Sequence, residues 1–298
     1  MITGGNARIR SEKVMEFLML LCSMVSVVTT VGIILVLSVD TVRFFGEVSF
    51  IDFVTDTQWT PLFEDKHFGI LSLLSGTLLT TCIAILLAVP VGVSIAVYLN
   101  EYASPKFTSI AKPILEVLAA VPTVVYGFFA LQFVTPLLQR FIPGLAGFNA
   151  LSPGLVMGVM IIPYITSLSE DALRAVPKSL REASYGLGAN RFQTAFSVLV
   201  PAANSGIIVS IILAVSRALG ETMIVAIAAG QEPKLTFNPL ESVETITTYI
   251  VQVSMGDVPQ DSLEYRTIFA AGMALFVLTF LLNNISFWIR KKYQRRYE

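Results

Sequence analysis

The chain has 298 residues, of which 54% are hydrophobic and 14% charged, and its mean hydropathy is +0.73. A soluble domain carries roughly 25% charged residues because its surface faces water, so the composition excludes a soluble enzyme of this length. The net charge is −1 and no basic tract alternates with aromatic residues, which leaves nucleic-acid binding without support. We therefore expect an all-α protein that crosses a membrane several times.

Several kinds of chemical site are also excluded. The two cysteines, Cys22 and Cys82, lie inside apolar runs, which argues against a disulfide framework and a thiolate metal cluster. His67 is the only histidine, so zinc motifs built on histidine pairs and most histidine-based acid–base chemistry are absent. No GxxxxGK[ST] loop occurs that would bind ATP phosphates. We expect no enzymatic activity, no catalytic residue, no metal and no cofactor in this chain.

Six stretches have the length and apolar character of a membrane-spanning helix, which needs about 20 residues. They are Val14–Val39, Gly69–Leu99, Ile114–Leu138, Gly154–Leu168, Phe196–Ala229 and Thr267–Ile289. The first stretch follows basic residues, as a signal peptide does, but its apolar core is too long and no small-residue cleavage pattern is clear. We interpret it as a retained anchor helix.

The distribution of Lys and Arg predicts the orientation, because cytoplasmic loops are enriched in both. Fourteen of the 20 basic residues fall in the N-terminus, the second and fourth connections and the C-terminus, five fall in the other connections, and Arg217 lies within a span. Both termini are therefore expected in the cytoplasm. The two long outer connections carry 12 acidic residues, which would repel a free anion, so an anionic cargo would need a separate protein to deliver it.

The longest cytoplasmic connection, residues 171–195, reads DALRAVPKSLREASYGLGANRFQTA. Its apolar residues recur at spacings of three and four, which predicts one amphipathic helix lying on the membrane or docked in a partner's groove. The members of this stripe are Leu173, Val176, Leu180, Ala183 and Leu187.

The same connection resembles the coupling loop of ABC importer permeases. Glu182-Ala183-Ser184, Gly188, Val198, Val200 and Pro201 match the pattern E-A-A-x3-G-x9-I-x-L-P with three conservative departures. Small residues allow close packing against another protein, and Gly188 permits a sharp turn. The resemblance implies that Glu182, Ala183 and Gly188 dock into a separate ATPase subunit.

Three further segments are similar to permeases of phosphate importers. They are residues 68–104, residues 116–127 (EVLAAVPTVVYG) and residues 216–223 (SRALGETM). The resemblance runs from about Phe68 to the C-terminus, and the additional first span with its long outer loop is typical of PstC-type subunits. It implies the type I ABC importer permease fold as one transmembrane domain over 1–298, with an anchor at about 14–39, a five-helix core at about 69–289 and a coupling loop at about 171–195.

The resemblance also implies partners and a location. A chain of this family works in the bacterial inner membrane with a homologous PstA-type permease, two PstB-type ATPase subunits that bind ATP and Mg²⁺, and an external PstS-type phosphate-binding protein. It forms half of the translocation pathway and performs no covalent chemistry.

Arg217 and Glu221 are the expected centre of the substrate pathway. At positions i and i+4 of one helix they would share a face, and charges inside a bilayer usually face a partner or a wet cavity. Arg217 suits a phosphate oxyanion because its planar guanidinium donates paired hydrogen bonds, and Glu221 would moderate its charge. The alternative is a structural ion pair that locks two helices. Thr123, Tyr126, Ser216 and Thr222 could offer hydroxyls to a moving anion or serve as ordinary helix contacts.

Three other functions compete with phosphate import. Side-chain chemistry alone does not exclude another oxyanion such as sulfate or molybdate. An ion-coupled secondary transporter predicts inverted repeats, of which the sequence shows no convincing sign, and it leaves the coupling motif unexplained. An intramembrane enzyme would need a histidine or paired aspartates within the spans, which are missing.

Overall fold

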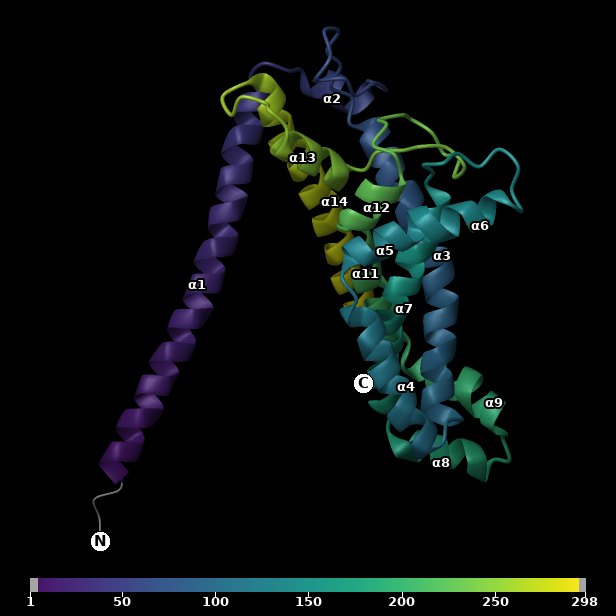
Figure 1. Ribbon diagram of the computed structural model, residues 1–298. Helices are drawn as coiled ribbons and strands as arrows, with labels where there is room; N and C mark the ends of the chain where they lie inside the picture. Colours follow the sequence, from purple (N-terminus) through teal and green to yellow (C-terminus); the bar gives the residue numbers. More distant parts are fainter. Residues whose placement is uncertain (1–4, 295–298) are drawn as a thin grey trace.

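The computed structural model describes residues 5–294, and helices dominate this part of the chain (Figure 1). Within it, the only β-type pairings are two isolated bridges, Trp59 with Phe68 and Gly230 with Val243. The helices in chain order are α1 (Gly5–Phe45), α2 (Phe50–Thr55), α3 (Leu71–Glu101), α4 (Pro105–Ala120), α5 (Thr123–Phe129), η1 (Ala130–Val134), α6 (Thr135–Gln139), α7 (Leu151–Arg174), α8 (Lys178–Gly186), α9 (Arg191–Thr194), η2 (Ala195–Leu199), α10 (Val200–Ala202), α11 (Asn204–Leu219), α12 (Met223–Ala228), α13 (Ile246–Met255) and α14 (Leu263–Gln294).

Four of the described helices, α1, α3, α7 and α14, are each long and apolar enough to cross a membrane. Two further pairs of segments qualify only together, because each pair is sharply bent. Pro105–Ala120 and Thr123–Gln139 meet at 87°, and Arg191–Ala202 and Asn204–Leu219 meet at 71°. The expected third and fifth spans are therefore bent rather than continuous helices.

Proline chemistry explains the first bend. Val121 precedes Pro122 and adopts an extended conformation (ψ 129°), as steric contact with the proline ring favours. The Tyr126 hydroxyl, beyond the bend, donates a hydrogen bond of 2.7 Å to the Leu118 carbonyl before it. This bond reaches back across the break to a carbonyl in the last turn of α4, which has no partner within that helix.

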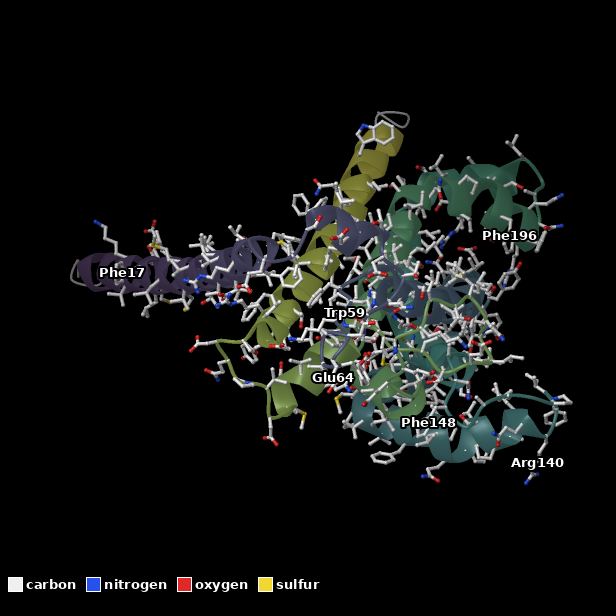
Figure 2. All side chains as sticks on the ribbon, turned by 90° about the horizontal axis from the view of Figure 1, so that it is seen from above. Phe17, Trp59, Glu64, Arg140, Phe148 and Phe196 are labelled. Atoms are coloured by element: carbon white, nitrogen blue, oxygen red, sulfur yellow. The ribbon has the colours of Figure 1, made fainter. Side chains whose placement is uncertain are left out.

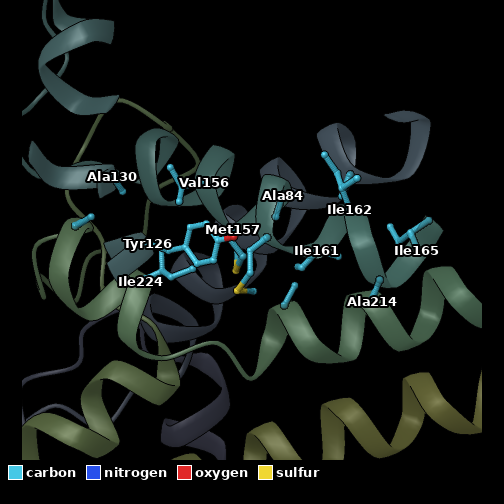
Figure 3. Close-up of a cluster of buried hydrophobic side chains, with 14 residues drawn as sticks. Ala84, Tyr126, Ala130, Val156, Met157, Ile161, Ile162, Ile165, Ala214 and Ile224 are labelled. Atoms are coloured by element: carbon cyan, nitrogen blue, oxygen red, sulfur yellow. The ribbon is translucent and has the colours of Figure 1, made fainter. Parts of the chain in front are cut away.

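The core forms where α3 and α7 cross, and three glycines bring their backbones together. A Cβ on Gly92 would lie 2.9 Å from the Ile165 side chain, and a Cβ on Gly154 would lie 2.8 Å from the Ile83 side chain. Gly158 faces the Ala84 carbonyl in the same way. Figure 3 shows the buried cluster around this crossing, with Met157 at its centre and Tyr126 reaching in from α5. Such close approach is how membrane helices gain packing energy without a hydrophobic driving force.

Among the described side chains, those near the C-terminal end of the long helix α1 pack against the rest of the protein. There Phe44 packs in a second buried cluster with Phe53, Trp59 and Tyr249. The helix then leans away from the other helices (Figure 1), and the view from above shows Phe17 at its far end, well outside the body (Figure 2). Apolar side chains along this free stretch are exposed, which suits a helix surrounded by lipid.

The two sets of connections distinguished by their basic residues lie at opposite ends of the helices. Helices α8 and α9 lie at the same end as the beginning of α1, whereas α2 and the connection from α12 to α13 lie at the other end (Figure 1). This arrangement follows from the alternation of the spans.

Candidate functional site

Arg217 and Glu221 do not share one helix face, contrary to the sequence-based expectation. Helix α11 ends at Leu219 and Gly220 is its C-cap, so Arg217 lies in the last turn and Glu221 lies beyond the helix. No ion pair joins the two residues in the described part of the chain. The alternative of an Arg217–Glu221 ion pair is therefore also wrong.

Glu221 instead bonds to the backbone at the break between α11 and α12. Its side chain is buried, and Oε1 accepts hydrogen bonds from the backbone N–H groups of Met223 (3.1 Å) and Ile224 (3.3 Å). These are among the first N–H groups of α12, which have no partner within the helix and favour a negative charge. The Glu221 carbonyl accepts a further bond of 2.8 Å from the Thr247 hydroxyl. Glu221 thereby ties α11, α12 and α13 together.

Arg217 is exposed and its guanidinium stacks on an aromatic ring. Its Cζ lies 4.2 Å from the ring centroid of Tyr164, a residue of α7. This cation–π contact holds the guanidinium in place, while its N–H groups make no hydrogen bond or ion pair within the described residues. Sequence reasoning missed Tyr164 because nothing in the sequence places that part of α7 beside the end of α11.

The hydroxyl residues of the expected pathway divide into two groups. Thr123 begins α5, and Thr222 lies in the break next to Glu221. Helices α5 and α12 pack closely, since a Cβ on Gly127 would lie 2.8 Å from the Ile227 side chain. The two helix breaks therefore lie on neighbouring elements.

The other two hydroxyls point into helix contacts. Tyr126 is buried and its hydroxyl donates its hydrogen bond to the Leu118 carbonyl. The Ser216 hydroxyl donates a bond of 3.1 Å to Asn283 of α14. Both hydroxyls therefore already bond to groups of this chain.

A cleft of about 340 Å³ lies between α4 and α7, next to Tyr164. Its lining combines apolar residues with polar and charged ones, and the latter are Lys112, Glu116, Tyr164, Thr166, Ser167 and Glu170. Glu170 is buried, and its carboxylate forms ion pairs with Lys112 Nζ at 2.9 Å and Arg174 Nη2 at 2.8 Å. Glu170 and Arg174 are four residues apart on α7, a spacing that could have suggested their pairing; the contact with Lys112 depends on the fold.

The loop over residues 171–195 does not form the single amphipathic helix that its apolar spacing suggested. Leu173 is buried at the end of α7, and Pro177 separates that helix from α8. The stripe is therefore divided between two helices. Only Leu180 and Ala183 lie within α8, and Leu187 follows it with 90% of its surface exposed.

Helix α8 is anchored to the rest of the protein by one face. Arg181 forms an ion pair with Glu101 and a hydrogen bond of 2.7 Å to Asn100, both at the end of α3. Ser184, the departure from a third small apolar residue in the motif, is buried and its hydroxyl lies 2.9 Å from that of Thr194. This second contact connects α8 to α9.

The opposite face of α8 is exposed in the described part of the chain. Glu182 and Ala183 are both exposed there, and the exposed Leu187 follows. Gly188 has φ +84°, a left-handed conformation that glycine adopts without steric cost, in line with the sharp turn expected at this position. The three residues of the motif thus border one exposed surface at the end of the molecule opposite α2.

At the α2 end, the connection before α13 carries one buried carboxyl group. Glu244 is 1% exposed and its Oε1 has no hydrogen-bond partner in the described structure. Burial raises the pKa of Glu244 to about 8, because the charged form loses its hydration. This group is therefore expected to be protonated at neutral pH.

Comparison with known proteins identifies the family. Residues 88–298 match the model of the family described as "Binding-protein-dependent transport system inner membrane component". The probable ABC transporter permease YqgH of Bacillus subtilis is 36% identical over 262 residues, covering 87% of this chain and 84% of that protein. The phosphate transport system permease PstC of Mesorhizobium japonicum is 33% identical over 256 residues, covering 78% and 76% of the two chains.

Solved structures show the same fold. A chain of a bacterial ABC transporter involved in the import of the acidic polysaccharide alginate superimposes with a TM-score of 0.64 at 16% identity, covering 96% of this chain and 99% of that one. A chain of the MetNI methionine ABC transporter, in an inward-facing conformation, gives a TM-score of 0.57 at 17% identity, covering 76% and 94%. The type I ABC importer permease fold expected from the coupling motif is confirmed. The chain therefore belongs to the family of binding-protein-dependent inner membrane transport components, the permeases of ABC importers, and resembles its PstC-type members.

Proposed function

We propose that this chain is the permease subunit of an ATP-driven, binding-protein-dependent importer of inorganic phosphate, and that it forms half of the translocation pathway. The curated relatives named as phosphate transport permeases support the substrate, since they align over about three quarters of the chain. The partners would be a second, PstA-type permease, two PstB-type ATPase subunits and an external PstS-type phosphate-binding protein.

The main support for this proposal is that the guanidinium of Arg217 is available to bind an anion. It is an exposed guanidinium whose donors are not used by a protein carboxylate among the described residues. Its planar arrangement of N–H groups suits the paired oxygens of a phosphate. The cation–π contact with Tyr164 orients the group without competing for these donors. Arg217 can therefore attract an anion that passes along α7 and α11.

Transport also requires that the anion leave again, so its site must bind weakly. The Glu221 carboxylate, four residues from Arg217, adds negative charge near the break while remaining engaged with the N–H groups of α12. Thr123 and Thr222 supply the nearby hydroxyls. We assign Tyr126 and Ser216 to positioning of the helices around this path, because their hydroxyls already bond within the protein.

Coupling to ATP would run through Glu182, Ala183 and Gly188. The exposed face of α8 would dock on the ATPase subunit, which binds ATP and Mg²⁺. Its other face is held by α3 through Arg181, so a movement of α8 would be transmitted to a membrane-spanning helix. ATP binding and hydrolysis drive import only if they favour different states of the pathway.

The proposed orientation in the bacterial inner membrane has both termini and α8 in the cytoplasm. Single cysteines at Lys178 and Glu64, introduced after replacing Cys22 and Cys82 by serine, test it with a membrane-impermeant maleimide. Labelling at position 64 from outside intact spheroplasts, and at position 178 only after lysis, supports this orientation. The reverse pattern excludes it.

The function is tested by purifying the tagged chain with its membrane partners and reconstituting the complex in vesicles. Phosphate-loaded binding protein should stimulate ATP hydrolysis and phosphate uptake, whereas sulfate- or molybdate-binding proteins should not. Equal stimulation by a sulfate- or molybdate-binding protein would overturn the phosphate assignment and leave the importer class intact. Purification of the chain without any ATPase would overturn the proposed coupling.

A further inference from the structure

Two clefts run along α4 from Tyr164 to the end of α7. The first, of about 340 Å³, is the one between α4 and α7 that contains Tyr164. The second, of about 520 Å³, lies beside the first half of α4 and is also lined by Arg174. Both clefts are lined by Lys112 and Glu116, so they adjoin each other. Tyr164, on whose ring Arg217 stacks, lines the first cleft, and Arg174 at the end of α7 lines the second.

The charges in these clefts are unevenly exposed. The Glu170 side chain is 3% exposed, whereas those of Lys112 and Arg174 are 33% and 56% exposed. One buried carboxylate thus pairs with two more exposed cations. Lys112 lines both clefts, Glu170 lines the first and Arg174 lines the second. Ser167 adds a hydroxyl that has no hydrogen-bond partner in the described part of the chain.

We propose that Lys112 and Arg174 form a second anion site, at the inner end of the phosphate path, which receives the anion after Arg217 and releases it to the cytoplasm. This inference rests on the proposed function and orientation. The route follows the α7 face that carries Tyr164, Ser167 and Glu170, so the anion would move along one helix from the Arg217 end to the α8 end.

The chemistry of the site matches a phosphate that must be released. An ammonium and a guanidinium both donate charge-assisted hydrogen bonds to oxyanions. Glu170 binds the same donors, so an arriving anion competes with a carboxylate that is already in place. The exposed Glu116 at the same clefts lowers the positive potential further. Both carboxylates keep the anion from being trapped, as conduction through successive sites requires.

A purely structural role for these ion pairs is the rival explanation. Lys112 connects α4 to α7 through Glu170, and this contact could simply lock the two helices. The two explanations predict different directions of change in phosphate binding when Lys112 and Glu170 are substituted. For an anion site, removal of the Lys112 charge weakens phosphate binding, whereas removal of the Glu170 charge frees both cations and strengthens it. For a lock, both substitutions disrupt the same contact and act in the same direction.

The test uses the complete complex in vesicles that enclose ATP, with the phosphate-loaded binding protein outside. The initial rate of labelled phosphate import is measured against increasing unlabelled phosphate in the lumen, with potassium chloride as the ionic-strength control. Lumenal phosphate is expected to occupy the inner site and inhibit import. Lys112→Gln should raise the half-inhibiting concentration by about tenfold, which is the order expected for one lost charge-assisted hydrogen bond.

Control variants separate the outcomes. Glu170→Gln should lower the half-inhibiting concentration, and Lys112→Arg should stay near the wild type. Lys106→Gln should have no effect, because Lys106 is an exposed α4 residue that lines neither cleft. Shifts in the same direction for Lys112→Gln and Glu170→Gln, or no inhibition of the wild type, would overturn the inner site. Absence of import by the wild type with phosphate-binding protein would instead refute the proposed function itself.

Discussion

Substitutions at Arg217 and Tyr164 offer a quantitative test of the substrate path. They separate the effect of the Arg217 charge from the effect of holding its guanidinium in place. Replacement by glutamine removes the cation and its paired donors, and replacement by lysine keeps the charge without the planar fork. Tyr164→Leu keeps Arg217 but removes the ring that lies 4.2 Å from Cζ. Tyr164→Phe retains the ring and removes only the hydroxyl.

The magnitudes follow from these contacts. A hydrogen bond to a charged group is worth about 1.5–3 kcal/mol, so losing a bidentate pair costs roughly 3 kcal/mol or more, or about 100-fold in rate at 1.4 kcal/mol per tenfold. A cation–π contact at an exposed site is worth about 0.5–1 kcal/mol, which corresponds to a loss of about two- to fivefold. We expect uptake to fall in the order wild type, Tyr164→Phe, Tyr164→Leu, Arg217→Lys, Arg217→Gln.

The assay is initial uptake of labelled phosphate by vesicles containing equal amounts of assembled complex, with subunit ratios checked after purification. Uptake by Arg217→Gln within about threefold of the wild type, with the complex intact, would refute the reasoning and move the anion path elsewhere. A loss in Tyr164→Phe as large as in Arg217→Gln would show that the hydroxyl, and not the ring, is the important group.

Three further predictions concern coupling, packing and pH. Glu182→Lys should reduce co-purification of the ATPase by more than about tenfold while the chain still inserts, because charge reversal at a docked surface costs several kcal/mol. Glu182→Gln should have a smaller effect. Normal co-purification of the ATPase with Glu182→Lys would exclude the proposed coupling surface. Gly76→Ala should destabilise the protein by about 1–3 kcal/mol, because the added Cβ would lie 2.2 Å from the Glu244 carbonyl oxygen. Gly147→Ala is the control, since its added Cβ would have no atom within 4 Å. Equal melting temperatures of the two variants would contradict this prediction. Burial raises the pKa of Glu244 from 4.5 to about 8, so between these pH values the folded state keeps a proton that the unfolded chain has lost. The melting temperature of the wild type, relative to that of Glu244→Gln, should therefore fall as the pH rises from about 5 to about 8. A constant difference in melting temperature across that range would refute this prediction.

The class of the protein and its family could both be predicted from the amino-acid sequence alone. Long apolar runs are incompatible with a soluble fold, and the low share of charged residues leaves no other place for these runs than a membrane. The coupling motif and the segments around Pro122 and Arg217 identified the permease family, which the family match then confirmed. Local backbone chemistry was readable too, since Gly188 has the left-handed conformation expected at a sharp turn.

The pairing of the charged residues, by contrast, depends on how the helices pack in three dimensions. Hydropathy is averaged over a window of residues, so it does not reveal that α11 ends at Leu219 within a continuous apolar run. For this reason the prediction that Glu221 shares a helix face with Arg217 was wrong. Helical periodicity likewise continued across Pro177, where α7 has already ended. The contacts of Arg217 with Tyr164 and of Lys112 with Glu170 join residues that are distant in the chain. They depend on how the helices cross, and helix crossing is set by side-chain packing that no local pattern records.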